Sequence, residues 1–374
     1  MDVIMRLRQP GNLLRELSFP FDPRISDLDG DGAVEIQSGT VRWRPPVGGG
    51  DLQWRVTVQE ERGTGAYDAL LTDEWGIFRA EDVIPRARTR TLKGAESRTT
   101  MSFDLPSGWT AVSEYSALNE PIIIDRPERR FDEPTGWIAL GRLGVRRETI
   151  AGIRVAIAGP EGHDVRRMDM LALLAWTLPE LVEILPYDFP RLTIVSAGDP
   201  MWRGGLSAPA SMFIHADRPM ISENATSTLL HEVVHTAMLI NTRDGYDWIA
   251  EGLAEYYSIE LLRRSNAITK KRADFAFERQ ADWAAKADTL CARTSTGPNT
   301  ALAVTVFKQL NDELSRRTRG EVTLDSLLPY LTEGEVDATT LMAAAEQLID
   351  SVPDALHIDN LPGCLSIAPG EAEN

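Results

Sequence analysis

The 374-residue chain has only two cysteines, Cys291 and Cys364, both in its C-terminal third. They lack the Cys-x-x-Cys spacing, which excludes a metal or redox pair of that type. Two free thiols are one interpretation of these residues. A single disulfide that fixes the C-terminal tail is the other, and it would indicate a compartment outside the cytoplasm.

Long apolar runs are also missing. No uninterrupted apolar segment reaches the length of a membrane-spanning helix. The first residues, MDVIMRLRQPGNLLREL, lack the charged start, apolar core and small-residue cleavage site of a signal peptide. We therefore expect no membrane span, in a protein that is either cytoplasmic or the mature form of an exported one.

Basic residues are in the minority, with 39 Lys and Arg against 56 Asp and Glu and a net charge of -17. This excess of negative charge argues against binding to nucleic acid, which requires a basic face. One basic segment is present, RARTRTLKGAESR at 86–98. A single short run in an acidic protein is best interpreted as a solvated strand edge or loop.

The chain is too long for one ordinary core, so it predicts two or three domains of α+β type. Residues 1–145 contain short alternating segments, such as TVRWRPP and DLQWRVTVQEE, between Gly, Pro and Asp clusters. This pattern favours a β-sandwich-like domain. Residues 146–265 predict a mixed α/β domain, and residues 266–374 a helical region.

Within the α/β segment, strands are expected at 153–159, 191–198 and 211–215. A helix is expected over 166–185, where Pro179 predicts a kink or a break.

Two histidines then stand four residues apart in the sequence HEVVH. On a helix, His231 and His235 lie on one face, so both imidazoles reach one point. Zinc accepts such ligands at about 2.0–2.1 Å. Glu232 lies about 100° round the same helix and can reach a water beside the ion as a general base.

A catalytic zinc ion usually has a third protein ligand, and Glu251 is the candidate. It follows His235 by sixteen residues, past the polar loop INTRDGYD, at the start of a new helix. Glu255 shares its face and is expected to hold one histidine ring by its outer N–H. The alternative is an ordinary pair of core helices, since a bare His-Glu-x-x-His recurs by chance. The downstream Glu-Gly-Leu-Ala-Glu favours one zinc ion per chain.

HEVVH followed by WIAEGLAEYY resembles the gluzincin metallopeptidases, whose pattern is His-Glu-x-x-His, a spacer and Glu-Gly-φ-Ala. Within that group the chain is most similar to the glycyl aminopeptidase-like family and more distantly to the M1 aminopeptidases. The segments at 203–215 and 296–327 extend the likeness. The resemblance implies a thermolysin-like catalytic domain, an exported bacterial enzyme and a peptide or protein substrate. It makes His231, His235 and Glu251 the zinc ligands and Glu232 the base.

The resemblance also implies a substrate-binding segment. Gly204, Gly205 and Leu206 would lie beside the substrate backbone, with the strand at 211–215 offering an edge for it to pair with. Aminopeptidases of this group usually place a glutamate next, where it grips the free amine of the substrate. Ser207 holds that place here, and a neutral serine cannot counter an ammonium charge.

The tyrosine with which this family stabilises the transition state precedes a glycine in the downstream segment. The equivalent place, near Thr294 by Gly297, carries no tyrosine. His215, Arg203 and Tyr330 are the candidate replacements, and the loss of such a donor commonly costs roughly a hundredfold in rate. These departures motivate a rival hypothesis, a zinc scaffold that binds peptides or a protein partner with little hydrolysis.

One further segment, SDLDGDGAVE at 26–35, imitates a calcium loop. Asp27, Asp29 and Asp31 alternate, but the twelfth position is Ser38 instead of a carboxylate. We therefore interpret this segment as a tight polar turn, and no calcium site is expected.

Overall fold

The structure is a computed structural model that describes residues 1–115, 122–124, 131, 133–332 and 334–364. Its internal contacts divide the chain into two compact units. The first unit comprises Met1–Val145, Ile157–Val165 and Thr193–Arg203. The second unit comprises Arg146–Ala156, Arg166–Leu192 and Gly204–Asn374. The three-domain division at residues 145 and 265 remains a prediction.

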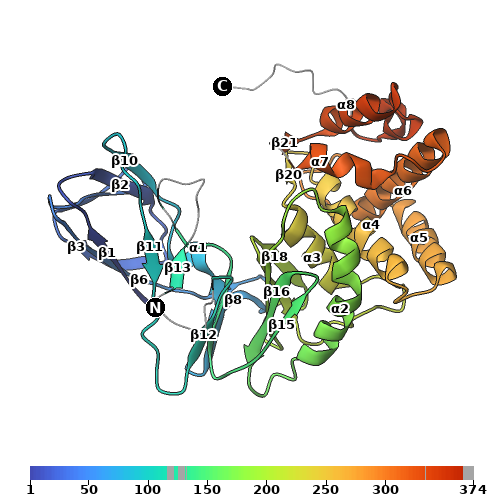
Figure 1. Ribbon diagram of the computed structural model, residues 1–374. Helices are drawn as coiled ribbons and strands as arrows, with labels where there is room; N and C mark the ends of the chain where they lie inside the picture. The colour runs from blue at the N-terminus through green and yellow to red at the C-terminus, as the bar shows by residue number, and fades with distance from the viewer. Residues whose placement is uncertain (116–121, 125–130, 132, 333, 365–374) are drawn as a thin grey trace. The chain divides into compact units, whose positions relative to one another are not determined.

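The first unit is built from antiparallel strands (Figure 1). One sheet has the order β1-β6-β3, formed by Asp2–Arg8, Gly49–Val56 and Ile25–Gly30. A second has the order β10-β2-β5-β4, formed by Arg88–Thr91, Leu14–Pro20, Thr40–Arg44 and Ala33–Gln37. A third has the order β12-β14-β9-β8-β7, formed by Thr110–Val112, Trp137–Gly141, Trp75–Arg79, Tyr67–Leu71 and Glu60–Glu61. A strand pair, β11-β13, joins Thr99–Met101 to Ile122–Ile124, and a short helix, α1, spans Ala80–Val83.

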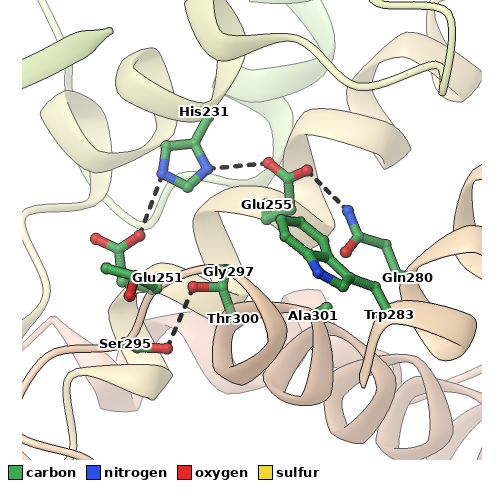
Figure 2. A pocket seen from close by; sticks show the side chains of 10 residues that line it. His231, Glu251, Glu255, Gln280, Trp283, Ser295, Gly297, Thr300 and Ala301 are labelled. Atoms are coloured by element: carbon green, nitrogen blue, oxygen red, sulfur yellow. Dashed lines mark hydrogen bonds and ion pairs between the residues drawn. The ribbon is translucent and has the colours of Figure 1, made fainter. Parts of the chain in front are cut away.

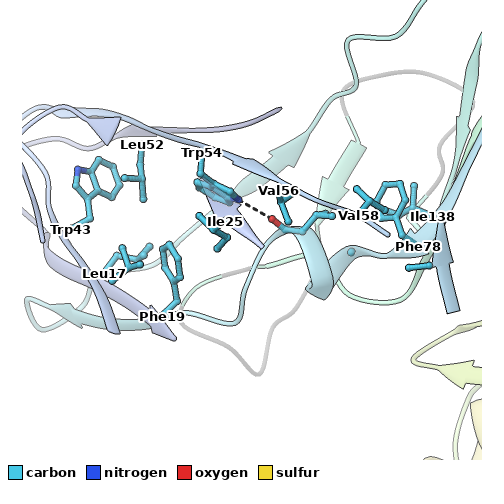
Figure 3. Packing of buried hydrophobic residues seen from close by; sticks show 14 of the residues in the cluster. Leu17, Phe19, Ile25, Trp43, Leu52, Trp54, Val56, Val58, Phe78 and Ile138 are labelled. Atoms are coloured by element: carbon cyan, nitrogen blue, oxygen red, sulfur yellow. Dashed lines mark hydrogen bonds between the residues drawn. The ribbon is translucent and has the colours of Figure 1, made fainter. Parts of the chain in front are cut away.

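The core of the first unit is formed by side chains at alternating positions of these strands. In β6, Leu52, Trp54 and Val56 point inward while their neighbours are exposed. The indole of Trp54 packs on Phe19 and donates its N–H to the carbonyl oxygen of Val83 over 3.1 Å (Figure 3). The β-rich prediction for this segment is thus confirmed, whereas the sandwich arrangement of its sheets remains a prediction.

Two polar segments of the first unit have in part the local structure that the sequence predicts. The acidic segment forms most of β3 and the start of β4, and only its centre, Asp31 and Gly32, is the predicted turn; Asp27, within β3, forms an ion pair with Arg55 at 3.1 Å. The carboxylate of Asp31 accepts a hydrogen bond from the Asp51 amide over 2.9 Å. The basic segment contains β10, an edge strand of its sheet.

A fourth main sheet, with five strands, is formed by residues between Leu143 and His215. Its order is β15-β16-β17-β19-β18, formed by Leu143–Ile150, Ile153–Pro160, Arg191–Ala197, Ser211–His215 and Gly205–Ala208. The expectation that residues 211–215 offer a free strand edge is wrong. The chain folds back at Pro209 and Ala210 into a hairpin, so β19 has a strand on each side and the edge strand is β18.

The rest of the second unit is mainly helical, and the predicted helices are confirmed. The helices are α2 Arg167–Ile184, α3 Thr228–Met238, α4 Trp248–Arg264, α5 Lys270–Ala284, α6 Pro298–Thr318, α7 Leu328–Leu331 and α8 Ala338–Ile349. Single turns of 3-10 helix lie at Leu324–Leu327, Asp354–Leu356 and Ile358–Asn360, and β20 (Asn241–Thr242) pairs in parallel with β21 (Glu335–Val336). Of the helices that the structure describes, none combines the length and apolar character that a bilayer crossing requires.

Two local features, the proline in α2 and the cysteine pair, settle points that the sequence left open. Helix α2 continues through Pro179 without a break. Pro179 has no N–H to donate to the carbonyl of Ala175. Both residues lie on the exposed side of the helix, where water can donate that hydrogen bond instead. Cys291 and Cys364 form a disulfide, so the free-thiol interpretation is wrong.

Candidate metal centre

Helices α3 and α4 bring the predicted ligands together. The hydroxyl of Ser227 caps α3 by accepting a hydrogen bond from the Leu230 amide over 3.3 Å. Leu239 ends the helix in a left-handed conformation, with φ 48°, and the chain then turns back into α4. The apolar residues of α3 are buried, among them Leu229, Leu230, Val233, Val234 and Ala237. Their burial fixes the rotation of the helix and leaves the two histidine side chains 16% exposed.

Three side chains converge at one point. The Nε2 atoms of His231 and His235 lie 3.1 Å apart. Oε2 of Glu251 lies 3.4 Å from Nε2 of His231, and its other oxygen, Oε1, lies 3.2 Å from Nε2 of His235. Ligand atoms at about 2.0–2.1 Å from a tetrahedral zinc ion lie about 3.3 Å from one another. The observed separations therefore fit such an ion. Among the described residues, this is the one His, Cys, Asp and Glu group with metal-site geometry.

A second carboxylate orients one ring. Oε2 of Glu255 lies 3.1 Å from Nδ1 of His231 (Figure 2). The side-chain amide of Gln280, from α5, donates to the other oxygen of Glu255 over 2.9 Å. A carboxylate that accepts the Nδ1 proton leaves Nε2 of the ring as the metal-binding atom. Glu255 thus contacts the outer nitrogen of His231, and its role toward a bound metal remains a prediction.

Glu232 lies against β18. The glutamate is only 8% exposed, and a Cβ atom added to Gly205 would lie 2.5 Å from its Cγ. A larger residue at position 205 would therefore displace the Glu232 side chain. The backbone N–H of Ser207 bonds to that carboxylate. The predicted substrate-binding segment and the predicted base are thus neighbours in the structure.

The charges of the cluster favour a cation at its centre. Burial raises the pKa of Glu232, although the two histidines oppose the shift. Burial would also raise the pKa of Glu251, but hydrogen bonds with His231 and His235 outweigh it and hold that pKa below its usual range. Burial lowers the pKa of His231, yet Glu251 and Glu255 more than offset it and leave this pKa well above its ordinary value. The carboxylates therefore stabilise positive charge where the metal would bind.

A cavity of about 280 Å³ adjoins the cluster, lined in part by His231, Glu251 and Glu255. Helix α5 and the segment that begins α6 supply its remaining walls, with Gln280, Trp283, Ser295, Thr296, Gly297, Thr300 and Ala301. The carboxylate of Asp247, at the start of α4, accepts a hydrogen bond from the Ser295 amide over 2.7 Å. This bond fastens the α6 segment beside Glu251.

The three candidate transition-state donors do not line this cavity. His215 is completely buried, and its Nδ1 accepts a hydrogen bond from the Asp217 amide over 3.2 Å. The guanidinium of Arg203 pairs with Asp199, and Tyr330 lies in α7. The burial of His215 supports a structural role.

Sequence reasoning missed Gln280, Trp283 and Asp247. Gln280 and Trp283 lie in an amphipathic helix with no spacing that relates them to the histidines. Asp247 looks like an ordinary residue ahead of a helix. Their positions at the site follow from the packing of α5 and α6 against α4, which no local pattern encodes.

No protein-family model and no curated protein matches this sequence. A solved structure that does match is an aminopeptidase N family protein from Idiomarina loihiensis, with a TM-score of 0.65 and 15% sequence identity. The match covers 88% of this chain and 67% of that one. At this identity the likeness concerns the fold. The chain therefore has a mixed α/β, aminopeptidase-like fold.

Proposed function

We propose that this chain is a zinc-dependent metallopeptidase of the gluzincin type, acting on peptides or proteins. The observation that carries the proposal is the triad of His231, His235 and Glu251, in which the two imidazole Nε2 atoms lie 3.1 Å apart and each faces one oxygen of the Glu251 carboxylate, at 3.4 and 3.2 Å. The adjoining buried Glu232 and the aminopeptidase-like fold support it.

In this proposal His231, His235 and Glu251 hold the metal, and Glu255 fixes the ring of His231. A bound zinc ion supplies a Lewis acid that polarises the scissile carbonyl and makes water more acidic. Glu232 accepts the proton of the attacking water and delivers it to the leaving amine.

The substrate would lie along β18. This strand ends its sheet, and an extended peptide can add to such an edge by backbone hydrogen bonds. Gly204, Gly205, Leu206 and Ser207 would then follow the substrate backbone beside Glu232. Ser207 gives the substrate's amine no counter-charge, so we propose an aminopeptidase-like enzyme that lacks the glutamate that usually binds this amine.

The first test is zinc content by elemental analysis, with wild type beside His235→Ala. About one zinc ion per chain in the wild type, lost in the variant, is the expected result. Absence of zinc from both proteins, even after metal is offered, would overturn the proposal.

The second test separates an enzyme from a binding scaffold. Glu232→Gln should retain zinc and lose roughly a hundredfold or more in peptide hydrolysis, because it removes the base and keeps the ligands. Peptides with free and blocked N-termini distinguish aminopeptidase from endopeptidase activity. Zinc binding without hydrolysis by the wild type would favour the scaffold.

A further inference from the structure

We propose that the cavity beside the triad receives one side chain of the substrate, and that Trp283 selects an aromatic side chain there. The proposal rests on the proposed function, because it assigns a specificity pocket to the same site. It begins from the position of Trp283, which lies in the last turn of α5 and lines the cavity while remaining 46% exposed. Large aromatic rings are usually much better covered, and this one offers a ring for stacking.

The wall next to Trp283 has little side-chain bulk. Gly297 has φ 57° and ψ −121°, a conformation that glycine adopts far more readily than other residues. A Cβ atom at Gly297 would lie 3.6 Å from Cζ2 of Trp283, so a larger side chain there would fill the space beside the indole. Ala301 contributes only a methyl group to the same wall (Figure 2). Next to the indole the cavity is therefore bounded by the backbone of Gly297 and the methyl group of Ala301, and no bulky side chain of theirs covers the ring.

The charges of the residues that line the cavity indicate which class of substrate side chain it would accept. Among its described residues, Glu251 and Glu255 carry carboxylates, and no Lys or Arg is present. An acidic side chain would be attracted by the proposed metal ion but repelled by the carboxylates of Glu251 and Glu255, which line the cavity itself. A basic side chain would be attracted by the same two carboxylates but repelled by the proposed metal ion. An uncharged aromatic side chain meets neither cost and gains the stacking contact.

The test uses zinc-loaded protein and peptides that differ only on one side or the other of the scissile bond. Each position is varied through Phe, Tyr, Ala, Lys and Asp, and kcat/KM is measured. The wild type should prefer Phe or Tyr over Ala by about tenfold or more at one position, because the ring is buried. Trp283→Ala should abolish this preference, and Trp283→Phe should restore most of it.

A matched control is available on the same helix. Phe275 is 45% exposed on α5 and does not line the cavity, so Phe275→Ala should leave the preference unchanged. An aromatic preference that survives Trp283→Ala would overturn the proposal. So would a preference for Lys or Asp, or an equal loss of activity for every peptide, which would mean a structural role for Trp283.

A binding measurement separates this proposal from the proposed function. Zinc-loaded Glu232→Gln protein is titrated with the same Phe and Ala peptides by calorimetry. Tighter binding of the Phe peptide, lost on adding Trp283→Ala, would support the pocket even if the wild type hydrolysed nothing. Equal affinities for both peptides would overturn the pocket even if the wild type were an active peptidase.

Discussion

Gly205 and Glu232 show how one missing side chain shapes the candidate site. Glu232 is buried on α3, and its carboxylate occupies the space that a Cβ atom at residue 205 would need. The backbone N–H of Ser207 holds the same carboxylate. The glycine that the resemblance places beside the substrate thus has a second role, since it admits the base to the edge of β18.

Gly205→Ala should therefore lower kcat/KM by roughly a hundredfold, because displacement of a catalytic group by about 1 Å commonly costs that much. Zinc content should not change, because the atoms nearest to a Cβ at residue 205 belong to Glu232, which is not a proposed ligand. Gly48→Ala is a suitable control, since a Cβ atom there meets no other atom within 4 Å. Full activity of Gly205→Ala would show that the position of Glu232 does not limit turnover.

At the scale of elements, the geometry of α4 depends on α5. The amide of Gln280 is buried and donates to Glu255, which in turn faces His231. Helix α5 thus contacts the candidate metal centre through Glu255 of α4 without supplying a proposed ligand. Contacts of this kind orient the ligands of metal sites.

Gln280→Leu should weaken zinc binding by about 10- to 100-fold, because the orientation of Glu255 and hence of His231 is no longer fixed. Competition with a chelator measures the affinity, and circular dichroism checks that the helices persist. Glu278→Gln, on the exposed side of the same helix, should bind zinc like the wild type. Equal affinities in all three folded proteins would contradict the role of Gln280.

At the scale of the whole molecule, one disulfide joins distant parts of the second unit. Cys291 and Cys364 are 73 residues apart in the sequence. The segment after Cys291 continues directly into Ser295 and Gly297, which line the cavity. The disulfide therefore fixes one end of the cavity wall, and the bond from Ser295 to Asp247 fixes it again beside α4.

Replacing both cysteines by serine should lower the free energy of unfolding by about 4 kcal/mol, the value expected for closing a loop of this length in the unfolded chain. Urea denaturation without reductant measures the difference. A reducing agent should shift the wild type towards the double variant and leave the variant itself unchanged. Identical transitions for the two oxidised proteins would show that the disulfide contributes little.

The sequence alone determined what repeats along a single element. The spacing of His231 and His235 places both rings on one face, and the same rule puts Glu255 over Glu251, because helix geometry is fixed by the backbone. Alternation and periodicity likewise predicted most strands and helices. The tertiary structure alone decided which strand forms the sheet edge, whether the cysteines pair, and that Gln280 and Trp283 reach the site. Such contacts join residues far apart in the chain, and they depend on how whole elements pack together, which local spacing does not specify.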